Sequence, residues 1–168
     1  WQISLGSVAD MGQAITPALM FVGDQFGRAR EAIDLYTDLF PDSAVHRVDT
    51  YDDADNHQAG RIQHARFSLA GQRFIAMDSA HMHDFAFTEG MSLMIGCDTQ
   101  DELDRYWDRL VEGGQESRCG WLRDRFGLSW QVVPTVLTDL MNDPERARRV
   151  TAAFLPMIKL DIQALLDA

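Results

Sequence analysis

The order of β-like and helical segments repeats once along the chain, and this repeat constrains the fold more than any other feature. In each half a short apolar run precedes an amphipathic segment, and two or three β-like runs follow. The segments span 15–22, 27–40, 44–51, 61–70 and 72–78 in the first half, and 91–97, 99–114, 117–123 and 128–133 in the second. We therefore predict an α+β chain built from a duplicated strand-helix-strands unit, here called modules 1 and 2.

Helix-start signals follow the second module. Asp143, Pro144 and Glu145 combine an N-cap residue, proline in the first turn and an early acidic residue, which is typical of a helix start. A last amphipathic helix is expected over 159–168. The predicted organisation is an N-terminal extension (1–13), paired modules (14–134, comprising 14–80 and 90–134) and a helical C-terminal tail (135–168).

Charge and cysteine usage exclude several classes of partner. The formal net charge of the 168 residues is -11, so we expect no nucleic-acid partner and no binding to anionic membranes. No apolar run approaches the roughly 20 residues of a membrane span. Cys97 and Cys119 have no metal-binding spacing and are expected to be reduced thiols, which favours a cytoplasmic location.

The segment CGWLRDRFGLSWQVVP, residues 119–134, predicts a hairpin. Arg125-Phe126-Gly127 fits a three-residue loop with glycine in the left-handed position. Closing the loop between the flanking residues places Trp121 opposite Gln131, and paired residues lie on one face of a sheet. Ser129 then shares that face by alternation.

The element order, together with FVGD, AIDLYTDLFP, the hairpin segment and the KLDI tail, resembles the vicinal oxygen chelate superfamily. The similarity is to its PhnB-like branch, the 3-demethylubiquinone-9 3-methyltransferase-like family, and covers nearly all of residues 14–168. It implies two βαβββ modules that form a curved mixed sheet around a pocket, a homodimer, and, in metal-dependent members, four His or Glu ligands on inward strand positions.

The resemblance also implies which positions would hold those ligands. They are Pro17, then Ile75 or Ala76, then Ser92 and Gln131. A divalent site needs imidazole or charged ligands in number, and none of these residues supplies one. We therefore interpret Pro17, Ser92 and Gln131 as degenerate metal positions, and expect no metal and no cofactor.

The predicted function is that of a PhnB-like protein of the glyoxalase/bleomycin-resistance fold, which binds a small, partly apolar molecule in a metal-free pocket. If the family architecture holds, the lining residues are Leu19, Phe21, Trp121, Ser129 and Gln131. A filled core between the sheet halves is the structural alternative. No catalytic residue is assigned.

An enzyme of the same superfamily is the alternative function: a metal-dependent lyase, isomerase or oxygenase with unorthodox ligands such as His64, His81 or His83. His81-Met82-His83 has two imidazoles two residues apart, but a flexible loop between the modules is the better interpretation of this segment. Methyltransferase activity is not expected, because no glycine-rich turn suits a nucleotide-like cofactor.

Overall fold

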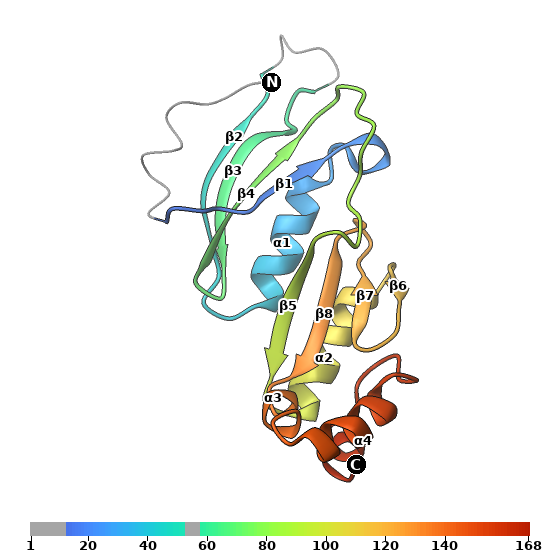
Figure 1. Cartoon of the computed structure of the whole chain (residues 1–168). Helices are drawn as coiled ribbons and strands as arrows, with labels where there is room; N and C mark the ends of the chain where they lie inside the picture. Colours follow the sequence, from blue (N-terminus) through green and yellow to red (C-terminus); the bar gives the residue numbers. More distant parts are fainter. Residues whose placement is uncertain (1–12, 53–57) are drawn as a thin grey trace. The chain divides into compact units, whose positions relative to one another are not determined.

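The computed structural model describes residues 13–52 and 58–168, which form two compact units on either side of the Ala86–Phe87 bond (Figure 1). Each unit is described by itself. Of the predicted N-terminal extension, residues 1–12 lie outside the described residues. In the described part of the chain, none of the helices has the length and apolar character that crossing a membrane requires.

Module 1 is a four-stranded mixed sheet with one long helix. Its strand order is β1-β4-β3-β2, with β1 parallel to β4 and the other pairs antiparallel. This is the predicted βαβββ order. The elements are β1 (Ala18–Phe21), the 3-10 helix η1 (Gly23–Gln25), α1 (Ala29–Leu39), β2 (Ala44–Thr50), β3 (Ile62–Leu69) and β4 (Gln72–Asp78).

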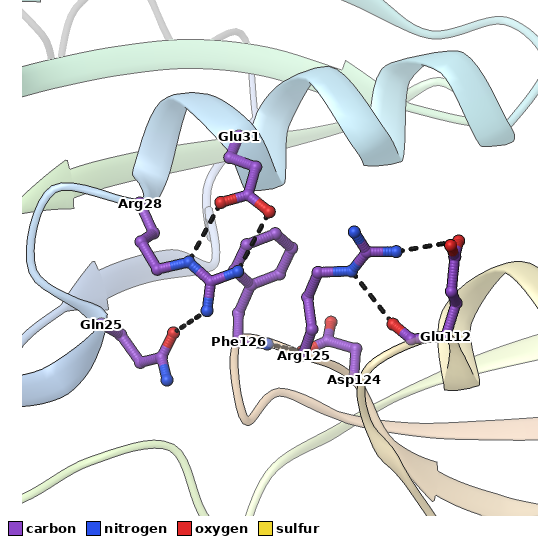
Figure 2. Close-up of polar contacts among 7 residues, drawn as sticks. All are labelled: Gln25, Arg28, Glu31, Glu112, Asp124, Arg125 and Phe126. Atoms are coloured by element: carbon purple, nitrogen blue, oxygen red, sulfur yellow. Dashed lines mark hydrogen bonds and ion pairs between the residues drawn. The ribbon is translucent and has the colours of Figure 1, made fainter.

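The helix α1 forms where apolar residues recur at helical spacing, and that stripe packs on the sheet. The apolar residues at this spacing are all buried: Ala29, Ala32, Ile33, Tyr36, Leu39 and Phe40. At the start of the helix, Arg28 pairs with Glu31 and donates to Gln25 (Figure 2).

Asp78, at the end of β4, holds three segments of module 1 together. Its carboxylate is 1 % exposed. One oxygen accepts hydrogen bonds from the Gly27 and Ala29 amides at 2.8 and 3.2 Å, and the other accepts from the Ile62 amide at 2.9 Å. Ionised acceptors form the stronger hydrogen bonds, so this buried carboxylate fixes the start of α1 against the start of β3.

Module 2 repeats the arrangement. Its strand order is β5-β8-β7-β6, with β5 parallel to β8 and the remaining pairs antiparallel. Thr99 caps the long helix of this module, because its hydroxyl accepts from the Glu102 amide at 3.2 Å. The elements are β5 (Ser92–Cys97), α2 (Gln100–Val111), β6 (Gln115–Glu116), β7 (Trp121–Arg123) and β8 (Ser129–Pro134).

The hairpin between β7 and β8 has the predicted loop. Gly127 adopts φ +89°, and the Asp124 amide donates to the Leu128 carbonyl at 2.9 Å. The Asp124 carboxylate, 3 % exposed, accepts from the Phe126 and Leu128 amides and from Trp130 Nε1. Arg125 pairs with Glu112 beyond the end of α2 (Figure 2). The sequence did not indicate that Phe126, a loop residue, would be fully buried.

The tail contains three helices: α3 (Leu137–Leu140), α4 (Pro144–Phe154) and α5 (Ile162–Leu166). Asp143 caps α4 as predicted, accepting from the Arg146 amide at 2.7 Å. The last helix is shorter than expected and begins after its own cap, Asp161.

The segment between α4 and α5 binds two other parts of module 2. The Cys119 and Gly120 amides donate to the Met157 and Ile158 carbonyls at 2.8 and 2.9 Å. Lys159 donates to Asp104 and Asp108 on α2. The residues just before the KLDI segment therefore bond the CGW segment, while Lys159 of KLDI bonds α2.

Candidate functional site

Two of the positions predicted to be degenerate metal positions lie side by side in module 2. Ser92 and Gln131 occupy the parallel neighbours β5 and β8, and the Gln131 amide Nε2 donates to the Ser92 hydroxyl at 2.8 Å. This distance means that ligands at these two positions could reach one ion. The side chains present are a neutral amide and a hydroxyl that bind each other.

Trp121 and Ser129, which were also predicted as lining residues, lie on the same face of the module 2 sheet as Gln131. Trp121 is paired with Gln131, which confirms the predicted register, and Ser129 is paired with Ser92. Ser129 is 1 % exposed, and among the described residues its hydroxyl has no hydrogen-bond partner. Met94, also on this face, is 65 % exposed. Trp121, Ser129 and Gln131 are thus brought together on one face; their role in ligand binding stays a prediction.

Leu19 and Phe21 lie in the core of module 1. They are 2 % and 0 % exposed, and Leu19 pairs with fully buried Ala76 on the face of the sheet that packs against α1. Their predicted role as pocket residues also stays a prediction. Of the two candidates for the second ligand position, Ile75 is half-buried whereas Ala76 is in the core.

The open face of module 1 contains a hollow of about 1130 Å³. Its floor includes Met20 and Met77, which are direct partners on the parallel strands β1 and β4. The walls come from β2, β3 and the segment after β4. The lining residues used below are Met20, His64, Met77, His81, Met82 and His83.

The three histidines named as alternative ligands, His64, His81 and His83, all line this hollow. Among the described residues, they do not belong to any cluster of metal-binding side chains. In residues 13–52 and 58–168, no group of three or more His, Cys, Asp or Glu side chains is placed to hold an ion. Burial lowers the pKa of His64 below its usual value of 6.5, and the neighbouring Arg66 and Arg47 act in the same direction against Asp49. His64 is therefore neutral at neutral pH.

The methionine floor was missed by sequence reasoning. We did not predict from the sequence that Met20, which lies between Leu19 and Phe21 on β1, would line a hollow. Asp78 was missed too. Its signal is a single acidic residue that ends β4 directly after four apolar residues.

Cys97 is not an activated nucleophile. Burial, reinforced by Glu102 and Asp98, raises the pKa of the Cys97 thiol to about 12. The thiolate is the reactive form, so Cys97 is inert at neutral pH. The Cys119 Sγ lies 3.6 Å from the Leu155 carbonyl oxygen.

Comparisons with known proteins agree with this fold. The family model described as 3-demethylubiquinone-9 3-methyltransferase matches residues 13–133. A solved structure described as a putative 3-demethylubiquinone-9 3-methyltransferase, PhnB protein, from Bacillus cereus is 36 % identical, with a TM-score of 0.68 over 73 % of this chain and 100 % of that one.

Two more distant structures are also similar to this chain, and the first of them shares its fold. Protein PA1353 from Pseudomonas aeruginosa is 24 % identical, with a TM-score of 0.60 over 71 % of this chain and 96 % of its own. The fosfomycin resistance protein FosX from Mesorhizobium loti is 13 % identical, with a TM-score of 0.43 over 70 % and 89 % of the two chains. A comparison with curated proteins finds no match. Because the family model spans well over half of the chain and the Bacillus cereus PhnB protein is similar over its whole length, this chain belongs to the 3-demethylubiquinone-9 3-methyltransferase family.

Proposed function

We propose that the protein binds a small, partly apolar molecule in the hollow of module 1, without a divalent metal at the positions that the superfamily resemblance implies. The observation that carries this proposal is the hollow itself. Its volume of about 1130 Å³ is ample for a small molecule, since such sites usually enclose about 300–1,000 Å³. A methionine floor supplies adaptable apolar contacts, and imidazole and amide groups in the wall supply hydrogen bonds.

The chemistry of the donor set supports a binding role without a divalent metal. Ser92 and Gln131 are near enough to share an ion, yet they offer only a hydroxyl and a neutral amide, which satisfy each other. In module 1, Pro17 has no ligating side-chain atom, and its carbonyl accepts from the Ile75 amide. Divalent ions of the first transition row prefer imidazole, thiolate and carboxylate ligands.

Methyl transfer is not part of the proposal, although the family description names it. The nearest glycine-containing segment before a helix runs from Gly23 to Gly27. The amides of Gly27 and Ala29, at the start of α1, donate to the Asp78 carboxylate. Helix-start amides that a protein carboxylate already holds are not available to bind an anionic cofactor group.

The binding test uses a fluorescent apolar dye, anilinonaphthalene sulfonate, and two matched substitutions. Met77→Glu places a negative charge in the hollow, where it repels the sulfonate, whereas Met94→Glu places the same charge on the exposed face of module 2. We expect Met77→Glu to weaken dye binding about tenfold, or about 1.4 kcal/mol, and Met94→Glu to leave it unchanged. The reverse result would place the site at Trp121, Ser129 and Gln131, and binding that neither variant changes would refute both locations.

Elemental analysis tests the metal-free part of the proposal. We expect purified protein to contain zinc, nickel or manganese far below one ion per chain, and Ser92→His/Gln131→Glu with Pro17→His to gain affinity that the parent lacks. Tight stoichiometric metal in the parent, lost in Gln131→Ala, would favour the metal-dependent lyase, isomerase or oxygenase instead.

A further inference from the structure

We propose that the ligand of the module 1 hollow is an uncharged, planar aromatic molecule whose ring lies on Met20 and Met77 and whose edge donates a hydrogen bond to the His64 imidazole. This inference rests on the proposed function and deepens it, because it names the chemical class of the ligand. The observation behind it is a row of side chains that crosses the open face of the module 1 sheet from β1 to β3.

The row follows from the strand register. Met20 on β1 is the direct partner of Met77 on the parallel strand β4. Between β3 and β4, Ala65 pairs with Ala76, and both are fully buried. Successive side chains of a strand point to opposite faces, so their chain neighbours His64 and Met77 lie side by side on the open face. All three side chains of the row line the hollow.

The two methionines suit an aromatic ring. Met20 and Met77 are half-buried and form one apolar floor. Neighbouring strands lie about 4.8 Å apart, so a single fused ring system spans both side chains. A thioether makes favourable contacts with an aromatic ring when the sulfur lies about 5 Å from it, and the flexible side chain adapts to the position of the ring.

His64 presents a hydrogen-bonding group beside this floor. The residue is half-buried, lines the hollow and is neutral at neutral pH. None of the described residues forms a hydrogen bond with its ring, whereas His46 and His83 each contact a serine hydroxyl, at 3.0 and 2.9 Å. A neutral imidazole has one acceptor nitrogen and one N–H group. An N–H or O–H group at the edge of a bound ring would therefore satisfy the acceptor nitrogen.

The charges around His64 favour an uncharged ligand. Asp49, its direct partner on β2, forms an ion pair with Arg47 at 2.8 Å, and both line the hollow. Arg66 also acts on His64, but it lines a separate, smaller hollow on the sheet. The Asp78 carboxylate is 1 % exposed and accepts from three backbone amides. In the part of the chain that the structure describes, the hollow thus offers neither a carboxylate nor an ammonium group an uncompensated opposite charge.

The hydrogen bond is tested by displacement of anilinonaphthalene sulfonate from the full chain with indole and with benzofuran, which have the same shape but differ in the ring N–H. Inhibition constants are corrected for the dye affinity of each variant. We expect indole to bind about fivefold more tightly than benzofuran, as one net hydrogen bond allows. His64→Leu should abolish this preference by weakening indole alone, and His64→Gln, which keeps an acceptor, should retain part of it. His46→Leu is the matched control, since His46 bonds Ser68 elsewhere on the sheet, and should keep the full preference.

The aromatic ring is tested with benzofuran and its saturated analogue octahydrobenzofuran. We expect benzofuran to bind about threefold more tightly, and the preference to shrink in Met20→Leu/Met77→Leu, which keeps apolar side chains but removes both sulfurs. Met94→Leu, on module 2, should leave it unchanged. Equal binding of indole and benzofuran by the parent, equal binding of benzofuran and its saturated analogue, or loss of the indole preference in His46→Leu would overturn this ligand class. Dye binding that Met77→Glu weakens would still support a site in the hollow, so a failure of this inference is separable from a failure of the proposed function.

Discussion

Replacing Asp124 with asparagine should destabilise module 2 severely, although the two side chains have nearly the same shape. The carboxylate accepts from the Phe126 and Leu128 amides at 2.9 and 3.0 Å with one oxygen, and from Trp130 Nε1 at 2.8 Å with the other. An asparagine can keep one of these oxygens only. Its NH2 group then faces an N–H donor at a position where the residue, Asp124, is only 3 % exposed to solvent.

The magnitude follows from the groups that lose their partners. At least two buried donors become unsatisfied, the asparagine NH2 and the N–H group that it faces, and each such group costs about 1–3 kcal/mol. The expected loss is therefore about 2–6 kcal/mol, a large part of the roughly 5–15 kcal/mol that stabilises a typical domain.

Urea unfolding followed by circular dichroism measures this loss. Asp161→Asn is the matched control, because Asp161 is an exposed N-cap and asparagine caps helices about equally well. The double mutant Asp124→Asn/Trp130→Phe removes the donor–donor conflict, so its loss should be smaller than the sum of the single losses by about 1 kcal/mol or more. If Asp124→Asn unfolds cooperatively within about 0.5 kcal/mol of the parent, the reasoning from unsatisfied donors is wrong.

Four other outcomes are expected. Iodoacetamide should modify Cys119 in the native protein and leave Cys97, whose thiol has a pKa raised to about 12, unmodified until the chain unfolds. Gly120→Ala should cost clearly more stability than Gly60→Ala, because both glycines have positive φ but only a Cβ at Gly120 would approach the β8 backbone, to 2.7 Å. The lowered pKa of His64 means that the unfolded chain binds the proton more tightly, so the urea midpoint should fall as pH drops below about 6.5, and less steeply in His64→Gln. Sedimentation at micromolar concentration should show a dimer, and a species of only 19.0 kDa would contradict that expectation.

Much of the fold could be predicted because its signals are local. The stripe of α1, the Thr99 and Asp143 caps and the register of Trp121 opposite Gln131 each depend on residues a few positions apart. A hairpin loop fixes its own register, since one glycine at φ +89° determines where the two strands meet.

The hollow could not be predicted because it depends on which face of β1 the helix covers. The strand is four residues long, and every residue in it is apolar, so alternation does not separate Leu19 and Phe21 from Met20. A methionine that faces a hollow has the same sequence signal as one in a core. The Asp78 carboxylate accepts hydrogen bonds from amides that lie 16 to 51 residues away in the sequence, so no local sequence pattern predicts them.

The contact between the segment after α4 and the start of β7 has a consequence for folding during synthesis. All strands of module 1 have been synthesised once residue 78 has left the ribosome. The Cys119 and Gly120 amides of module 2, by contrast, lack their carbonyl acceptors until Met157 and Ile158 have been synthesised. Chains emerge at about 5–20 residues per second, and domains near the N-terminus fold first. Module 2 therefore spends several seconds with an incomplete edge while module 1 is already able to fold, and a ribosome that pauses within α4 would extend the interval in which chaperones can bind that edge.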